Sequence, residues 1–119
     1  MKIFLNYQPP CWNEYINLER SNKYMANNLK QQEKKIVGLL ARGKKYTGEY
    51  PVEIIFRPHF KDKRRDLDNT RLKGILDGLV ACGAIRNDNL NYIQRIIIEP
   101  IFDKKEGVDI EINALNAQR

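Results

Sequence analysis

The stretch KDKRRDLDNTRLK, residues 61–73, decides both the fold and the chemistry expected of this chain. Asp66 and Asp68 stand two residues apart within it, so an extended backbone would point both carboxylates to the same side. Basic residues surround the two acids: Lys61, Lys63, Arg64, Arg65, Arg71 and Lys73. A basic run binds a polyanion without help, so the paired acids need a separate explanation.

A divalent cation provides that explanation. Mg²⁺ is a hard ion that takes oxygen ligands, usually one or two carboxylates together with waters and substrate phosphate oxygens. In this interpretation the basic side chains hold phosphates, while Asp66 and Asp68 hold the metal that acts on one of them. The pattern predicts a nuclease.

Composition sets the outer limits of the interpretation. The 119 residues predict one domain, residues 1–119, and a hydrophobic content of 42% argues against disorder. A net charge of +6 and a pI near 9.4 favour a polyanionic partner. No apolar run reaches the length of a membrane span, and the N-terminus lacks the apolar core of a signal peptide. Cys11 and Cys82 fit no zinc spacing, so we expect free thiols and a cytoplasmic protein.

The hydrophobic pattern predicts an α/β (α+β) domain in which two main helices pack on a mixed sheet. Alternating apolar residues indicate strands over residues 1–7, 51–60, 92–101 and 108–112, the third of them central in the sheet. Helical spacing indicates helices from Ser21 to about Gly43 and from Asp68 or Asn69 to about Cys82. The resulting order is β-α-β-α-β-β.

Smaller features complete this prediction. Cys11–Tyr15 has no clean period and is expected to be a loop, and Asp103–Gly107 is expected to be a hairpin turn. The lone His59 is expected to be structural or to contact phosphate. Lys73 would lean toward the helix N-terminus and so reach the acids. The predicted core stripe of the first helix comprises Leu29, Ile36, Val37, Leu39 and Leu40.

The order of these residues resembles the RusA-type Holliday-junction resolvases, small endonucleases typical of phages and prophages. Residues 65–69, RDLDN, match the R-D-x-D-N core of that family, and KGILDGL, residues 73–79, matches its helix. Asp88 falls where the third family acid is expected, and Pro9-Pro10 followed by Asn13 is similar to a stretch near the family N-terminus. The resemblance covers most of the chain and is strongest over residues 64–88.

One spacing departs from the family pattern. The family lysine commonly comes four residues after the second aspartate, whereas Lys73 is five residues after Asp68. The distances from Lys73 to Asp77 and on to Asp88 do agree, which places the extra residue around Thr70. Lys73 and Arg71 are therefore alternatives for the functional cation.

The resemblance implies a metal-dependent nuclease that cuts four-way DNA junctions as a homodimer by paired symmetric nicks. It implies that Asp66, Asp68 and Asp88 bind Mg²⁺, with Mn²⁺ as a substitute, and that Lys73 assists at the scissile phosphate. The phosphate contacts would come from the basic residues: Lys61, Lys63, Arg64, Arg65 and Arg71. No base-reading pattern is visible, so recognition of a branched shape is expected.

Two other functions fit the same residues. In a non-catalytic DNA-binding module, Asp66 and Asp68 would only cap the second helix, and Asp88 would be a turn residue. A nuclease of the same chemistry could also act on another branched nucleic acid, RNA included. The joint order of basic run, acid pair, helix lysine and third acid favours the junction nuclease over both.

Overall fold

The computed structural model describes residues 1–116 and shows one compact α+β domain, as predicted. Its elements follow one another along the chain as β1 (Lys2–Leu5), α1 (Trp12–Ser21), α2 (Lys23–Leu40), β2 (Val52–Phe60), the 3₁₀ helix η1 (Leu67–Asn69), α3 (Lys73–Ala81), β3 (Ile93–Ile98), β4 (Ile101–Phe102) and β5 (Val108–Ala114). Within these residues, no helix is both long and apolar enough to span a bilayer.

The sheet is mixed, and β2 is its central strand. The strand order is β1-β5-β2-β3, with β4 also paired to β2. β2 runs antiparallel to β5 and parallel to β3 and β4. β2 is buried along nearly its whole length, which explains why its sequence, VEIIFRPHF, is apolar beyond simple alternation.

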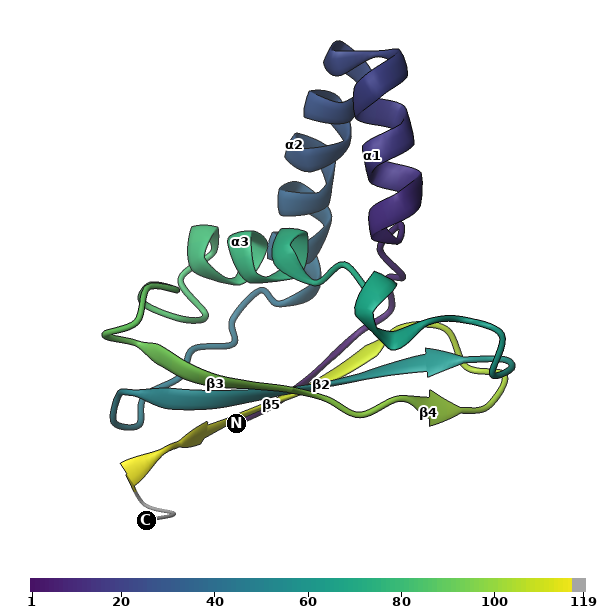
Figure 1. The fold of residues 1–119 in the computed structure, drawn as a ribbon. Coiled ribbons are helices and arrows are strands. Elements are labelled where there is room, and N and C mark those ends of the chain that lie inside the picture. Colours follow the sequence, from purple (N-terminus) through teal and green to yellow (C-terminus); the bar gives the residue numbers. More distant parts are fainter. Residues whose placement is uncertain (117–119) are drawn as a thin grey trace.

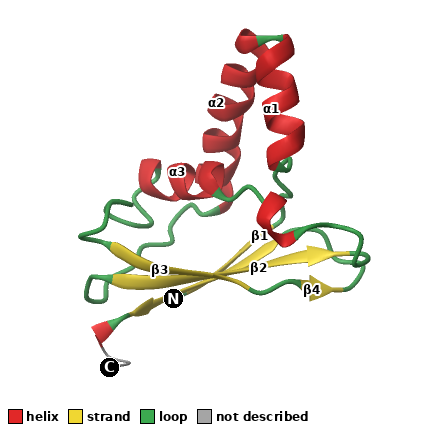
Figure 2. Ribbon diagram, viewed as in Figure 1, coloured by secondary structure: helices red, strands yellow, loops and turns green. Residues whose placement is uncertain are grey.

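All three α-helices lie on one face of this sheet (Figures 1 and 2). α1 and α2 form a pair that stands away from the sheet, and α3 lies across it. Alternate residues of β2 and β5 supply the core beneath the helices, together with apolar residues of α2 and α3: Val52, Ile54, Phe56, Ile110, Ile112, Val37, Ile75 and Leu79.

The other face of the sheet carries polar side chains in register. Arg57 of β2 pairs with Glu111 of β5 at 3.0 Å and with Glu99 at 3.3 Å. Asn113 donates a hydrogen bond to Glu53 at 3.2 Å. Successive side chains of a strand point to opposite faces of the sheet. The apolar residues of the alternating pattern therefore face the core, and the polar residues between them form ion pairs and hydrogen bonds on the other face.

The predicted loop at Cys11–Tyr15 is wrong, because α1 begins at Trp12. Tyr15 is buried on this helix, and Ile16 follows it, so Trp12, Tyr15 and Ile16 have helical spacing. Ser21 ends α1. Asn22 caps α2 instead, accepting the N–H of Met25 at 3.1 Å.

α2 ends earlier than predicted, and its buried residues differ from the predicted core stripe. It stops at Leu40, and its buried residues are Ala26, Glu33 and Val37. Leu39 is 70% exposed, and Ile36 and Leu40 are exposed as well. The helix contacts α3 and α1 along a narrow strip, so most of its apolar residues lie outside the core.

α3 begins at Lys73 rather than at Asp68 or Asn69. Leu67–Asn69 forms the separate 3₁₀ turn η1, and Thr70 and Leu72 lie between the two. The other end agrees with the prediction, since Gly83 follows α3 with a φ of 83°.

Two predictions about the last strands are wrong. β3 lies at an edge of the sheet rather than at its centre. Asp103–Gly107 is not a hairpin turn, because β4 and β5 lie on opposite sides of β2. This connection instead passes around the end of β2. There the backbone N–H of Asp103 donates to the Phe60 carbonyl at 3.0 Å, and the backbone N–H of His59 donates to the Gly107 carbonyl at 2.9 Å.

Candidate active site

The basic run leaves the end of β2 as an exposed loop. Arg64 donates hydrogen bonds to Asp62 through its backbone N–H at 2.9 Å and its guanidinium at 2.8 Å. These bonds lower the pKa of Asp62 to about 2. Lys63 lies over the Phe102 ring at 5.2 Å, and Arg65 lies over the Phe60 ring at 5.1 Å. The positive charges of the loop are therefore exposed to solvent, and two of them lie over aromatic rings at the end of the sheet.

The two acids of the motif lie at the 3₁₀ turn that follows this loop. Asp66 is extended and directly precedes η1, whereas Asp68 is inside it, so the extended backbone expected across both acids is absent. Both side chains are exposed. Asn69 anchors the turn, because its Oδ1 accepts the backbone N–H of Asn13 at 3.0 Å. α1 thus holds the acid-bearing turn in place.

Asp88 lies in the loop after α3. The Oδ1 of Asn87 accepts the N–H groups of Asp88 at 2.7 Å and of Asn89 at 3.3 Å, so the loop is an Asn-stabilised turn. The backbone N–H of Arg86 donates to the Tyr50 hydroxyl at 3.0 Å. The loop is therefore attached beside the residues that lead into β2.

These positions put Asp88 far from the other two acids within one chain. Asp66 borders a pocket with Pro58 and Phe60, at the end of β2. Val52 and Pro58 are six residue steps apart on β2, which corresponds to roughly 20 Å at about 3.3 Å per step. Figure 1 shows the same arrangement, with η1 and the loop after α3 at opposite ends of that helix.

The three aspartates are therefore not gathered at one place within one chain. Across residues 1–116, no three His, Cys, Asp or Glu side chains are grouped so that they could hold a metal ion. Asp66, Asp68 and Asp88 do have the oxygen donors that Mg²⁺ prefers. Their chemistry fits the metal that the family resemblance implies, but their placement in one chain does not.

Lys73 is the first residue of α3. Its ammonium lies 3.8 Å from the carboxylate of Asp77, one turn along, and its side chain is 63% exposed. Lys73 is thus held on the surface beside the acid-bearing turn without an ion pair to Asp66 or Asp68.

Arg71 has a different place from that expected of a phosphate-contacting residue. It is buried, and its guanidinium pairs with the fully buried Glu33 of α2 at 2.8 Å and 3.0 Å. The hydroxyl of Tyr7 donates to the same carboxylate at 2.7 Å. Burial, and then this bond, raise the pKa of Tyr7. Of the two alternatives for the functional cation, only Lys73 is on the surface.

Two aromatic rings of α1 cover Arg71. Its guanidinium lies 4.5 Å from the centre of the Tyr15 ring and 5.8 Å from that of Trp12. Together with Glu33, these rings fix the chain between η1 and α3. Arg71 consequently positions the segment that carries Asp66 and Asp68.

Sequence reasoning missed Glu33 as part of this region. Ala26, Glu33 and Val37 are seven and four residues apart, so Glu33 lies on the buried strip of its helix. An acid on that strip, with one arginine after the DxDN motif, was the available signal. The distance between them in the sequence, 38 residues, hid the pairing.

His59 is structural, one of the two roles expected for it. Its ring lies between Asp103, 2.9 Å from Nδ1, and Asp109, 2.6 Å from Nε2. Burial alone would lower the pKa of His59, but the hydrogen bonds to Asp109 and Asp103 outweigh it, and the pKa is raised. This group secures the end of β2 from the polar face of the sheet.

Comparison with known proteins agrees with the motif. The sequence model of the family described as Endodeoxyribonuclease RusA matches residues 6–113. A search of curated proteins finds no match. The matched span includes every motif residue from Arg64 to Asp88 and extends from the residue after β1 into β5. The chain therefore belongs to the RusA endodeoxyribonuclease family.

Proposed function

We propose that the protein is a metal-dependent, structure-selective nuclease that resolves four-way DNA junctions by paired symmetric nicks. Its context would be recombination, repair or phage DNA processing, in the cytoplasm. The observation that carries the proposal is the family match over residues 6–113. The exposed basic loop next to exposed carboxylates supports it. Cleavage of a phosphodiester requires basic side chains that hold the phosphates and, beside them, groups that act on one phosphate.

The bound metal would be Mg²⁺, with Mn²⁺ as a substitute. Such a metal lowers the pKa of water and stabilises charge on phosphate oxygens. Asp66 and Asp68 would supply oxygen ligands from the turn before α3. Lys73, exposed on the first turn of that helix, would neutralise charge that develops on the phosphoryl group.

The basic loop would hold the DNA on either side of the reacting phosphate. Lys61, Lys63, Arg64 and Arg65 are exposed side chains in one segment after β2. Contacts of this kind fix the position of the duplex and weaken with salt, because they release counterions. Arg71, which is buried against Glu33, would act by positioning the acids instead.

The homodimer is proposed for a reason of geometry. A two-fold dimer brings residue i of one copy to residue j of the other, twice. If Asp88 of a second copy lies beside Asp66 and Asp68, two complete acid triads form at once. Each of the two acid-bearing segments also has a large exposed apolar side chain. Leu67, between Asp66 and Asp68, is 45% exposed, and Leu90, two residues after Asp88, is 79% exposed. Pairing two copies would cover these leucines.

The first test is a cleavage assay with a labelled four-way junction and a matched linear duplex, in Mg²⁺, Mn²⁺ or EDTA. We expect paired nicks in the junction that require metal and that Asp68→Asn abolishes. Glu106→Gln, on an exposed loop residue, is the control and should cleave as wild type. Tight junction binding without cleavage in either metal would overturn the nuclease and favour a non-catalytic binding module. Equal or better cleavage of other branched substrates, RNA included, would change the substrate class.

A further inference from the structure

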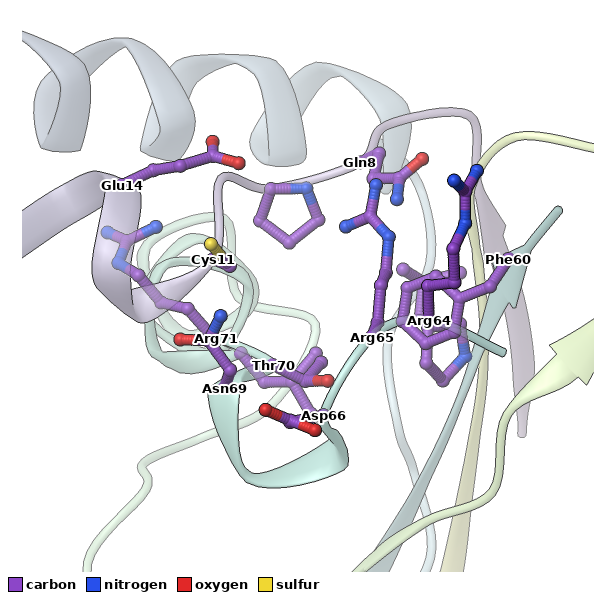
Figure 3. A pocket seen from close by; sticks show the side chains of 14 residues that line it. Gln8, Cys11, Glu14, Phe60, Arg64, Arg65, Asp66, Asn69, Thr70 and Arg71 are labelled. Atoms are coloured by element: carbon purple, nitrogen blue, oxygen red, sulfur yellow. The ribbon is translucent and has the colours of Figure 1, made fainter. Parts of the chain in front are cut away.

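A pocket of about 250 Å³ borders Asp66, and the proposal above gives its cavity no role. Three segments meet around it, together with Val108 of β5: the chain from Gln8 into α1, the end of β2 with its basic loop, and the stretch from Asp66 to Leu72. Figure 3 shows side chains of all three lining the cavity, with the Asp66 carboxylate at its edge. We call it the Phe60 pocket.

Part of the lining of the Phe60 pocket is apolar. Its apolar lining comes from the two strands and the residue before α3: Pro58, Phe60, Val108 and Leu72. The Phe60 ring is already in contact with a flat cation, the Arg65 guanidinium, at 5.1 Å. Rings and guanidinium planes are the surfaces on which unpaired bases stack in proteins.

The rest of the lining is polar, and it includes the charged residues Glu14, Asp66 and Arg71. Gln8 and Asn69 offer amides, and Arg64 and Arg65 offer guanidinium donors. The Oδ1 of Asn69 accepts the N–H of Asn13, which fixes the orientation of its amide and leaves the NH₂ group for a ligand. A lining that combines apolar side chains with hydrogen-bonding groups matches a heterocycle that has two apolar faces and hydrogen-bonding edges.

We propose that the Phe60 pocket takes one unstacked nucleobase next to the phosphodiester held at Asp66. This inference rests on the proposed function and adds how the cut is placed. At about 250 Å³ the pocket is smaller than the roughly 300–1,000 Å³ of sites for drug-sized ligands, so it suits a single base rather than a whole nucleotide.

The pocket gives a physical reason for selectivity toward branched DNA. Moving a base out of a duplex costs unstacking and unpairing energy, and this cost is lowest where pairing is already interrupted. At a branch point a base reaches the pocket more easily than within a linear duplex. Binding of one unstacked base in the pocket would then explain both the recognition of branched DNA and the position of the cut.

The test combines a missing base with a filled pocket. Junctions carrying a single abasic residue are scanned through the positions on both sides of the cleaved phosphodiester. Wild type should lose cleavage rate at one position only, by about tenfold, the order of loss expected when one stacked base is removed. Thr70→Trp, at a half-buried lining position, should cleave the intact junction about tenfold more slowly and be indifferent to the abasic residue.

Two controls make the result specific. Thr47→Trp adds the same side chain at an exposed residue outside the pocket and should respond to the abasic scan as wild type does. Thermal unfolding followed by circular dichroism shows whether Thr70→Trp is folded. In Asp68→Asn protein, which would bind without cutting, 2-aminopurine at the sensitive position should change fluorescence on binding, and adding Thr70→Trp should remove that change.

The outcomes separate this inference from the proposed function. A junction that wild type does not cleave at all contradicts the nuclease itself. Cleavage that is unaffected by every abasic position overturns the base pocket alone. The base pocket is also overturned if the abasic residue slows Thr70→Trp by the same factor as it slows wild type. The two changes would then act at different places.

Discussion

The guanidinium of Arg71 lies 2.8 Å from the carboxylate of Glu33, and the two side chains are 2% and 0% exposed. This pair joins α2 to the segment between η1 and α3. It therefore links the helical layer to the turn that carries Asp66 and Asp68. Because the pair is buried, the turn keeps its position only while Arg71 stays bound to Glu33 of α2.

Breaking this pair on one side should destabilise the protein strongly. Removing one partner leaves a buried charge uncompensated, which costs about 3–5 kcal/mol. We expect Arg71→Met to lower the free energy of unfolding by about that amount in urea titrations. The double variant Arg71→Met with Glu33→Leu should recover much of the loss. A double variant no more stable than the single one would contradict this account.

Gly78 allows α3 to approach α2. A Cβ on Gly78 would lie 2.6 Å from the Cβ of Val37, which requires one helix to move. We expect Gly78→Ala to lower the free energy of unfolding by about 1–3 kcal/mol. Gly38 of α2 is the matched control, because its added Cβ would meet Cys82 at an ordinary 3.6 Å. Gly38→Ala should be neutral or stabilising by up to about 1 kcal/mol in the same titration.

The basic loop should determine the salt dependence of junction binding. Each phosphate contact adds about 0.9 to the slope of log K against log salt. Lys63→Ala should therefore weaken binding and reduce the slope by about that amount. Lys2 of β1, paired in register with Glu111, is the control, and Lys2→Ala should leave the slope unchanged. A slope that Lys63→Ala does not alter would place the DNA elsewhere.

Two inactive variants should restore cleavage to each other if two copies share each site. Asp68→Asn and Asp88→Asn should each be inactive. A mixture refolded together contains dimers in which one site has all three aspartates, and these should nick one strand. Single nicks in place of paired nicks are the expected readout on a gel.

The control for this mixture uses two acids from the same half of the site. Asp66→Asn mixed with Asp68→Asn leaves every site incomplete and should remain inactive. If the Asp68→Asn and Asp88→Asn mixture also stays inactive while heterodimers are present, the shared site is excluded.

His59 should make stability depend on pH. Its folded pKa lies above 6.5, so its stabilising contribution is complete below the unfolded pKa of 6.5 and is lost as pH rises through the folded pKa. The pKa of Asp103, held down chiefly by its bond to His59, is below 3.8, so that contribution is lost only as pH falls through that lower value. The gap in Tm between wild type and His59→Gln should be larger at about pH 5.5 than at about pH 8.5. A gap of constant size would show that the ring is not charged in the folded protein.

Much of the fold could be read from local patterns. Alternation located β1, β2 and β5 because one face of each pleated strand is buried under the helices. Helical spacing and Gly83 located the body and end of α3. α1 was missed because its only buried residue, Tyr15, contacts Arg71, far along the chain.

The strand order was beyond those patterns. β3 is rich in isoleucine, which suggested a central strand, yet it lies at an edge of the sheet. Its neighbour β4 pairs with β2, so the link to β5 crosses the end of β2 instead of forming a hairpin. Pairing between strands depends on the whole sheet, and a single strand carries little information about its place in it.

By itself, the sequence determined the family, the basic loop and the identity of the acids, because these depend on residue types at fixed spacing. Only the tertiary structure decided which of those residues meet. It buried Arg71 against Glu33, opened a pocket beside Asp66, and put the loop that carries Asp88 at the other end of α3. The reason is geometric: spacing along a chain fixes neighbours on one element, whereas distances between elements follow from how helices and strands pack.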